Sequence, residues 1–370
     1  MMALIRDQNP RADIELKPIK KEDEKELQKV VCLRRLFIDR KDPLRHNICP
    51  DYYLWLYFQN PVKGSSFWAA YHKDQMMGIS TVVAKQVSIF GEKIKIGEDA
   101  AGFVHPAYQG RGIRTSLLKA NMKTVEKNGI ITVFGISRTK QIHRGFKKLN
   151  YTNIPALNLK CLIKPVNFKR LLNSTIKSKI FSTVGAFMIR AIYDLLFKKS
   201  APEPPEGISI QKDNFVSSAF DDFYLRCEKD YDVIQVRDSK YLNWRYFKGP
   251  DYYDFFSIRK GSGIVGYFVI NTTPWRDMKI GNIVDFLTFK GNSRLVESII
   301  SRAIFELQKR NVDMEQVWVL KGSPFYRHFL KCGFIPFRNV MVLFNNTELV
   351  RSLVEKKPVF HFTAGDSDYL

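Results

Sequence analysis

The stretch GEDAAGFVHPAYQGRGIRTSLLKANMKTVEKN, residues 97–128, decides how this chain folds. Its half-apolar first part predicts a strand that ends at His105 and Pro106. A glycine turn, QGRG at residues 109–112, follows, and the apolar side chains then recur at helical spacing. A strand, a glycine turn and a helix in this order place backbone N–H groups at a helix N-terminus, where they attract an anion such as a phosphate. The alternative is a tight strand-to-helix turn that binds nothing.

Residues 105–118, HPAYQGRGIRTSLL, resemble the signature of the GNAT acyltransferase superfamily, whose pyrophosphate loop reads Arg/Gln-x-x-Gly-x-Gly/Ala between a strand and a helix. Gln109 and Gly112 match this signature, whereas Arg114 stands where the family prefers glycine or alanine. An arginine there is able to pair with a phosphate from the side. The resemblance implies acetyl-CoA or another acyl-CoA as co-substrate, no metal, and these cofactor-binding residues: Phe103, Val104, Gln109, Gly110, Arg111, Gly112, Ile113, Arg114 and Thr115.

Length and charge narrow the class of protein. A chain of 370 residues exceeds one average domain, so two domains are expected. Its 59 Lys and Arg against 37 Asp and Glu give a formal charge of +22, which attracts nucleotide cofactors, nucleotide-sugars, phospholipid headgroups or nucleic acid. The basic residues are spread along the chain and no nucleic-acid-binding motif appears, so no specific nucleic acid is predicted.

The five cysteines are scattered and show no metal-ligand spacing, which predicts free thiols and no zinc site. The N-terminus lacks the apolar core of a signal peptide. The longest apolar stretch, residues 180–197, is interrupted by Arg190 and Asp194, which argues against a membrane span. We therefore expect a cytoplasmic protein.

The chain up to residue 163 predicts alternating elements of an α/β (α+β) fold. After a polar, irregular lead-in come strands near 14–19, 67–71, 77–87, 94–104, 131–137 and 156–163, and helices at 21–39, 51–61, after residue 112, and at 141–151. Residues 160–199 carry nine Lys or Arg against one acid. This segment is typical of a basic amphipathic helix on an anionic bilayer, or of a connecting helix packed on its own domains. APEPPEG, residues 201–207, marks a boundary.

After that boundary the sequence repeats. DYYLWLYFQNP (51–61) aligns with KYLNWRYFKGP (240–250), MGISTVV (77–83) with VGYFVIN (265–271), EDAAGF (98–103) with VDFLTF (284–289), and GFKKLNY (145–151) with HFLKCGF (328–334). The offset shrinks slowly from 189 to 183, which indicates a duplicated domain. The alternative is two unrelated α/β domains that share an aromatic helix.

The second copy lacks the glycine turn, because only KGNSR (290–294) stands in place of HPAYQGRGIRTS. It should not bind a pyrophosphate. The two-copy sequence resembles tandem GNAT proteins with one intact and one degenerate loop. This resemblance implies that each domain is a mixed, mostly antiparallel twisted sheet flanked by helices. We predict a first domain at 1–164, a basic helix and Pro-rich linker at 165–207, and a second domain at 208–370. The tail HFTAGDSDYL (361–370) is also similar to that of such proteins. Its Asp366 and Asp368 are expected in a solvated turn, the alternative being ligands for a cation.

The resemblance implies transfer of an acyl group to an amine, which must first lose its proton. Glu98 and Asp99, at the start of the strand, are the candidate bases, although Asp99 has a counterpart, Asp285, in the degenerate copy. A backbone N–H of Phe103 or Val104 would stabilise the oxyanion. His105 is interpreted as a turn residue. Where relatives carry a tyrosine that protonates the thiolate, this chain has Phe146, so no phenol is expected there.

Two functions remain open. The first is an N-acyltransferase acting on the amine of a small or lipid-linked acceptor, with an amino-sugar of surface polysaccharide synthesis suggested by analogy alone. The second is a catalytically weak binding or scaffold protein that uses its charge to hold an anionic membrane, at the inner face, or nucleic acid. The sequence defines neither the acceptor, the acyl chain length nor the oligomeric state.

Overall fold

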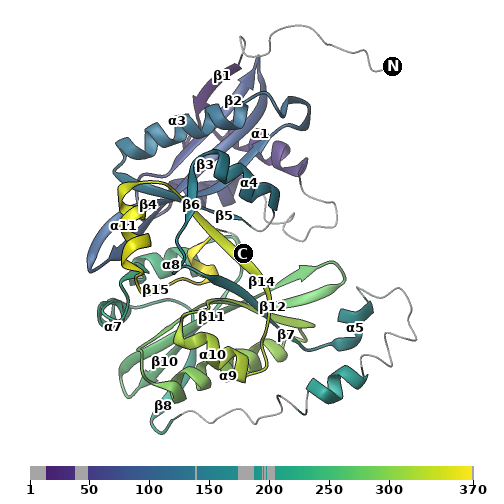
Figure 1. The fold of residues 1–370 in the computed structure, drawn as a ribbon, viewed down its shortest axis with the longest axis vertical. Helices are drawn as coiled ribbons and strands as arrows, with labels where there is room; N and C mark the ends of the chain where they lie inside the picture. Colours follow the sequence, from purple (N-terminus) through teal and green to yellow (C-terminus); the bar gives the residue numbers. More distant parts are fainter. Residues whose placement is uncertain are drawn as a thin grey trace.

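The computed structural model describes residues 14–37, 49–137, 140–173, 187–193, 195, 197 and 205–368 (Figure 1). The predicted lead-in, a large part of the basic segment and residues 201–204 of the proline-rich boundary lie outside the described residues.

The first half contains the elements that the hydrophobic pattern predicts, with bounds that shift by a few residues. They are β1 (Ile14–Pro18), α1 (Glu24–Arg35), α2 (Pro50–Tyr53) with the π-helical turn η2 (Leu54–Phe58), β2 (Ser66–His72), β3 (Gln75–Ile89), β4 (Glu92–Val104), η3 (Pro106–Tyr108), α3 (Ile113–Lys127), β5 (Ile130–Ser137), α4 (Lys140–Lys148), β6 (Tyr151–Asn153), β7 (Leu159–Pro165) and α5 (Phe168–Asn173). The β3–β4 hairpin turns at Phe90 and Gly91, which both have positive φ, as a two-residue hairpin turn requires.

The second half repeats this order. Its elements are β8 (Ile208–Asp213), α7 (Ala219–Glu228), β9 (Val233–Gln235), α8 (Ser239–Phe247), β10 (Asp254–Lys260), β11 (Gly263–Trp275), β12 (Met278–Thr288), α9 (Ser293–Gln308), β13 (Met314–Leu320), α10 (Pro324–Lys331), β14 (Ile335–Asn345), α11 (Glu348–Lys356), β15 (Phe360–His361) and η4 (Ala364–Asp366). Of all the helices in the described ranges, none combines the length and the apolar character that a membrane crossing needs.

One continuous sheet joins the halves. Its strand order is β1-β2-β3-β4-β5-β14-β7-β13-β12-β11-β10-β8, which reads as a palindrome when each strand is replaced by its counterpart in the other copy. The halves have exchanged their last long strands: β14 of the second half pairs with β5 of the first, and β7 of the first pairs with β13 of the second. The predicted fold class is confirmed, and the domain boundaries at 164 and 207 stay predictions.

The two aromatic helices of the repeat meet each other at the centre of the molecule. Trp55 Nε1 donates to the backbone oxygen of Trp244 (3.0 Å), and Trp244 Nε1 donates to that of Trp55 (3.2 Å). The two indole rings stack with centroids 4.9 Å apart. Reciprocal contacts between equivalent residues are what a two-fold relation requires. Trp55 and Trp244 are the residues that the sequence repeat aligns, so the packing supports the duplication.

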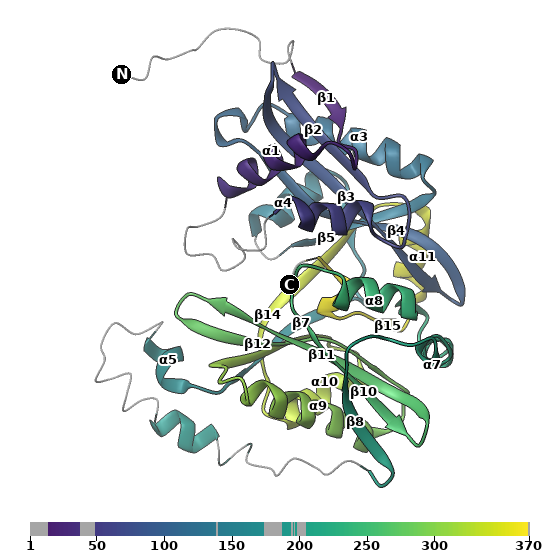
Figure 2. The same cartoon turned by 180° about the vertical axis from the view of Figure 1, so that it is seen from behind.

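The C-terminal tail lies between the two halves, as both views show (Figures 1 and 2). Thr363 and Ser367 are buried there, with 1% and 0% of their surface exposed. Helices α1 and α2 share a hydrophobic core with residues of both halves, from Leu27 of α1 to Trp244 of α8. The tail and this shared core make the junction a packed interior of the molecule.

Candidate active site

The site begins where two parallel strands part. β4 and β5 are paired from Lys95 to Glu98, whereas β4 continues to Val104 paired with β3. One residue of β3, Thr81, faces two of β4 at a bulge, and the Thr81 hydroxyl bonds both the N–H and the oxygen of Ala101 (2.9 and 3.0 Å). A bulge bends the strand that carries it. The edge of β4 beyond Glu98 is therefore free of β5 along the described register.

Backbone N–H groups on the open edge can be assigned from the alternation of the ladder. His105 N donates to Met77 O (2.7 Å), so the odd-numbered N–H groups here face β3 and that of Val104 faces the open edge. The Val104 oxygen accepts from the Gln109 side chain (3.1 Å). His105 caps the following turn η3 by accepting from Ala107 N (3.3 Å), which fits its interpretation as a turn residue.

The glycine loop has the geometry of an anion site. Gly110 and Gly112 have φ of 79° and 81°, a region that favours glycine. Gly112 is the N-cap of α3 and has no side chain to cap it. Within the described part of the chain, no hydrogen-bond partner meets the backbone N–H groups of residues 110–115. Free N–H groups and the positive end of the helix dipole meet at one exposed place.

Arg114 pairs with a carboxylate from the protein itself. Its guanidinium donates to both oxygens of Asp99 (2.8 and 2.6 Å) and to the Ser80 hydroxyl (2.5 Å). Burial raises the pKa of Asp99 above its usual value, although Arg114 acts in the opposite direction. The arginine passes so close to Gly102 that a Cβ there would lie 2.4 Å from it. Asp99 and Arg114 therefore fix α3 against β4.

Glu98 lies on the opposite face, at the junction. It is 2% exposed, forms an ion pair with the buried Lys85 (Nζ to Oε2, 3.0 Å), and accepts from the Ser367 hydroxyl of the tail (2.6 Å). Burial alone would lower the pKa of Lys85, and the charge of Glu98 raises it above its ordinary value. Glu98 and Asp99 thus point to different faces, as the strand alternation predicts, and both are engaged in ion pairs.

The tail aspartates are not in a solvated turn, which corrects the expectation for them. Asp366 is 2% exposed and accepts two bonds from Arg237 (both 2.7 Å). Asp368 is partly exposed and accepts from the Tyr52 hydroxyl (2.5 Å). Burial and the nearby charge of Glu98 raise the pKa of Asp368 to about 6. Sequence reasoning missed this carboxylate because its neighbours lie about 270 residues or more away in the chain.

Asp368 and the open edge of β4 share a neighbour. The Arg34 guanidinium lies 5.6 Å from the ring centroid of Tyr52 and 5.7 Å from that of Phe103. The Tyr52 hydroxyl donates to Asp368, and Phe103 belongs to the part of β4 that is not paired with β5. A titratable carboxylate, an arginine and two aromatic rings therefore gather beside the edge that carries Val104.

A buried phenol lies next to the phenylalanine that replaces the expected tyrosine. Phe146 packs against Gly135 of β5, and its ring is 5.0 Å from that of Tyr151. The Tyr151 hydroxyl has no hydrogen-bond partner among the described residues, although Tyr151 is 5% exposed. Burial, with a smaller effect of Asp99, raises the pKa of Tyr151. The aligned residue of the second copy is Phe334, so only the first copy has this hydroxyl. That difference was visible in the repeat.

The second half closes the equivalent place with its own side chains. Parallel pairing of β12 and β13 ends at Ile283, and Phe286 beyond it packs on Phe325 and Phe329 of α10 (4.9 and 5.4 Å between ring centroids). The N-terminus of α9 is capped by Asn292, whose side chain accepts from Leu295 N (3.0 Å). Because the gap is filled by apolar side chains and the helix is capped, this half has no counterpart of the anion site at the glycine loop of the first half.

Comparisons with known proteins agree with this geometry. Residues 18–147 match the model of a family described as the acetyltransferase (GNAT) domain. No curated protein sequence matches the chain significantly. Saccharomyces cerevisiae N-myristoyltransferase with bound myristoyl-CoA is a similar structure, with 13% identity and a TM-score of 0.62 over 90% of this chain and 79% of that chain.

Two further structures have the same fold. A GCN5-related N-acetyltransferase from Anabaena variabilis shows 13% identity and a TM-score of 0.57, covering 89% of this chain and 72% of its own. A tandem GNAT protein from the clavulanic acid biosynthesis pathway shows 10% identity and a TM-score of 0.58, covering 90% of this chain and 98% of its own. The match of residues 18–147 and these likenesses show that the chain has the GNAT-type fold, with two halves that share one architecture.

Proposed function

We propose that the first half transfers an acyl group from acyl-CoA to a primary amine, and that acetyl-CoA is the donor. The observation that carries this proposal is the row of N–H groups at residues 110–115 that have no hydrogen-bond partner in the described structure, in a loop whose Gly110 and Gly112 are exposed, next to the point where β4 and β5 part. These groups bind the pyrophosphate, with Arg111 and Thr115 at its side. The Val104 N–H on the open edge holds the thioester oxygen as it becomes an oxyanion, while Phe103 flanks it.

The amine needs a base, because an alkylammonium with a pKa near 10.4 is almost fully protonated at neutral pH. We assign this role to Asp368, which is partly exposed and has a pKa of about 6. Glu98 and Asp99, the bases expected from the sequence, are held by Lys85 and Arg114. In this scheme Glu98 is a positioning residue that holds the tail, and Asp99 positions Arg114.

The reaction then balances with groups of this chain. The amine nitrogen attacks the thioester carbon and forms the C–N bond, and the proton of the amine passes to Asp368. The C–S bond of the tetrahedral intermediate then breaks and releases the CoA thiolate. The CoA thiolate takes a proton from the Tyr151 hydroxyl, which regains one from solvent. Tyr151 suits this role because its hydroxyl has no other partner in the described structure and its pKa responds to Asp99 and Arg114 at the β4–β5 fork.

The acceptor that we propose is an amine on a small anionic or lipid-linked molecule, such as an amino-sugar nucleotide. A chain with a formal charge of +22 accelerates encounters with such molecules. The five cysteines are free thiols in the structure, which supports a cytoplasmic location.

Binding and product assays test this function. We expect acetyl-CoA to raise the melting temperature of the protein, and mass spectrometry to detect an acylated product among a panel of amino-sugar nucleotides. Myristoyl-CoA serves as the long-chain comparison. A melting temperature that no acyl-CoA shifts would contradict the enzyme proposal.

The pH profile tests the base. With Asp368 as base, kcat/KM should fall as the pH drops through about 6, and Asp368→Asn should lower the plateau and remove that limb. Because the folded pKa lies above the ordinary 3.8, this carboxylate lowers stability as the pH rises from about 4 to about 6. Asn, which carries no charge, should therefore keep the fold at pH 7. The exposed Asp74→Asn is the control, and an unchanged limb in Asp368→Asn would exclude this base.

One observation favours a second, accessory function at a membrane. The helical residues 187–193, with residue 195, expose five large apolar side chains: Phe187 (75%), Met188 (60%), Ile189 (45%), Ile192 (57%) and Leu195 (85%). The opposite side is attached to the second half, because the Tyr193 hydroxyl donates to Gly333 O (2.5 Å). An exposed apolar surface of this kind, in a stretch whose sequence is rich in Lys and Arg, is suited to an anionic bilayer.

Vesicle co-sedimentation tests the membrane contact. We expect binding to vesicles that contain phosphatidylserine, weaker binding in high salt, and loss of binding in Phe187→Ser/Leu195→Ser. Phe215→Ser/Tyr252→Ser, at positions that are 68% and 74% exposed elsewhere, is the matched control. Binding that ignores anionic lipid would exclude this function and leave the transferase proposal intact.

A further inference from the structure

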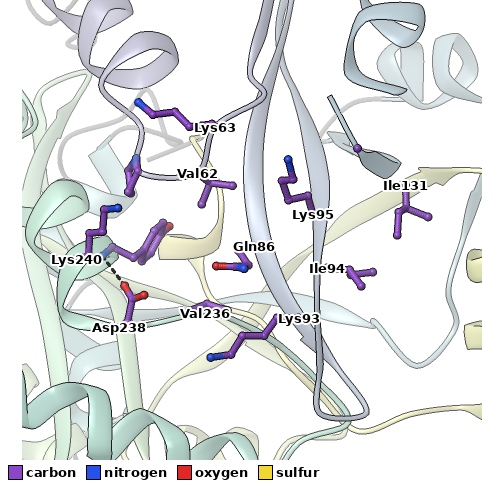
Figure 3. A pocket seen from close by; sticks show the side chains of 13 residues that line it. Val62, Lys63, Gln86, Lys93, Ile94, Lys95, Ile131, Val236, Asp238 and Lys240 are labelled. Carbon is purple, nitrogen blue, oxygen red and sulfur yellow. Dashed lines mark hydrogen bonds between the residues drawn. The ribbon is translucent and has the colours of Figure 1, made fainter. Parts of the chain in front are cut away.

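A pocket of about 540 Å³ lies where the two halves meet, away from the acyl-CoA loop (Figure 3). The first half contributes the loop before β2, the end of β3, the start of β4 and the α3–β5 turn. The second half contributes the segment between β9 and α8 and the first turn of α8. Figure 3 shows Lys240 and Asp238 on one side, Lys93 and Lys95 on the β4 side, and Gln86 between them.

The lining is strongly basic. It contains four lysines, Lys63, Lys93, Lys95 and Lys240, and a single carboxylate, Asp238. That carboxylate is already used as the N-cap of α8, because it accepts from Tyr241 N (2.7 Å). A cavity lined by one sign of charge concentrates counter-ions of the other sign.

The ammonium groups are available to a ligand. Within the described ranges, none of the four lysines takes part in an ion pair. Lys95 donates to the backbone oxygen of Asn128 (2.7 Å), and Lys93 lies 5.9 Å from the ring centroid of Tyr224. Lys63, Lys93 and Lys240 are exposed. Four like charges around one cavity repel each other, and an anion among them removes that cost.

The remaining lining explains which anion fits. Val62, Val236 and the half-exposed Ile131 give the pocket an apolar wall beside the lysines. The volume is in the range of pockets that hold small organic ligands. A phosphoryl or diphosphoryl group suits lysines, which bind phosphate as point charges, and a compact organic body suits the wall. An isolated carboxylate would leave most of the ammonium groups without a counter-ion.

This pocket cannot share a phosphate with the acyl-CoA loop. Lys93 and Lys95 are at the start of β4, and the loop follows its end. At about 3.4 Å per residue, Lys93 and Val104 are about 37 Å apart along the strand. The two basic places are therefore separate sites.

We propose that the pocket at the junction binds a phosphorylated small molecule through Lys63, Lys93, Lys95 and Lys240, independently of acyl-CoA. Because residues of both halves line it, the ligand holds the β3–β4 hairpin of the first half against α8 of the second. This site does not depend on the proposed transferase activity.

Calorimetric titration with inorganic pyrophosphate tests the site in the full chain. The Gly112→Glu background removes the glycine loop as a second phosphate site. In this background we expect pyrophosphate to bind. The double substitution Lys93→Gln/Lys240→Gln should weaken that binding about tenfold or more, and rising salt should weaken it too. The control pair Lys123→Gln/Lys260→Gln makes the same change in net charge at exposed positions outside the pocket. ADP in place of pyrophosphate tests whether an organic body adds affinity at the wall.

The outcomes separate this site from the transferase. Loss of affinity in the pocket pair alone supports the proposal, provided that the same pair, made in a protein that keeps Gly112, retains the shift of the melting temperature by acetyl-CoA. Equal losses in the pocket pair and the control pair would overturn it, since non-specific attraction then explains the binding. No pyrophosphate binding in Gly112→Glu would also overturn it. A wild-type protein that ignores acetyl-CoA would contradict only the proposed function.

Discussion

The N-termini of α3 and α9 occupy the same place in the two copies and treat their free N–H groups in opposite ways. In the second half the Asn292 side chain accepts from Leu295 N, so the chain itself provides a partner for one N–H group of this helix end. In the first half Gly112 offers no side chain, and the N–H groups up to Thr115 have no partner in the described structure. One copy leaves these N–H groups open to an outside anion, whereas the other caps its helix with a side chain of its own.

The two halves also differ in the gap beside each helix, where the parallel strands β4 and β5, or β12 and β13, separate. Phe286, Phe325 and Phe329 fill it in the second half, whereas the first half keeps an unpaired strand edge and the hydroxyl of Tyr151. The Phe146–Tyr151 pair and the Phe329–Phe334 pair have ring distances of 5.0 and 5.2 Å, so the two halves differ there by one oxygen atom. The two halves therefore differ at this pair of rings by one hydroxyl, in addition to the missing glycine loop and the filled gap of the second half.

The largest effect that tests this comparison concerns stability at the junction. Glu98→Gln should lower the free energy of unfolding by about 3–5 kcal/mol, because it leaves the buried Lys85 without its counter-charge. Asp285→Asn in the second half should cost less, since Arg237 keeps its bonds to Asp366. Urea unfolding measures both. Equal losses in the two variants would show that the halves depend on their acids in the same way.

The next effect concerns the ligand. Gly112→Glu should lower the affinity for CoA about 100-fold or more, because a carboxylate enters the phosphate site and a non-glycine residue must adopt φ of 81°. Gly291→Glu, at φ of 91° beside the N-terminus of α9, is the matched control and should leave CoA binding unchanged. Calorimetric titration with CoA measures both. A comparable loss from Gly291→Glu would contradict the assignment of the site to the first half alone.

Exchange of the single hydroxyl sharpens the comparison further. Tyr151→Phe should lower kcat about 10- to 100-fold with little change in KM for acetyl-CoA, because the thiolate loses its proton donor. Removing an unpartnered buried hydroxyl should not destabilise the fold. The reverse change, Phe334→Tyr, should cost about 1–3 kcal/mol of stability and leave kcat unchanged. An unaltered kcat in Tyr151→Phe would mean that water protonates the thiolate.

The smallest effect concerns the capped helix. Asn292→Ala should cost about 1 kcal/mol, as the loss of a helix cap usually does, and should leave CoA binding and turnover as they are. Thermal unfolding and steady-state kinetics measure this. A change in turnover would reveal that α9 contributes to the active site across the junction.

The local elements could be predicted from the sequence because their patterns are local. Apolar periodicity placed the strands near 77–87 and 94–104 and the helix after Gly112, and the glycine loop was recognisable by its spacing. The exchange of β7 and β14 could not be predicted, because the copies are alike and either strand fits the edge of β5. The same holds for Asp368: its partners Tyr52 and Glu98 become neighbours only after folding. Tyr151 could not be predicted from the resemblance, because the family position is occupied by Phe146.

The exchanged strands also determine when the molecule can be completed. The ribosome releases β5 long before β14, residues 335–345, which is the strand that covers its edge. Until then the nascent first half presents an open sheet edge, a known route to aggregation. Cleavage between the halves would likewise not free two separate proteins, since each fragment would remain paired through β7 and β14 to the other.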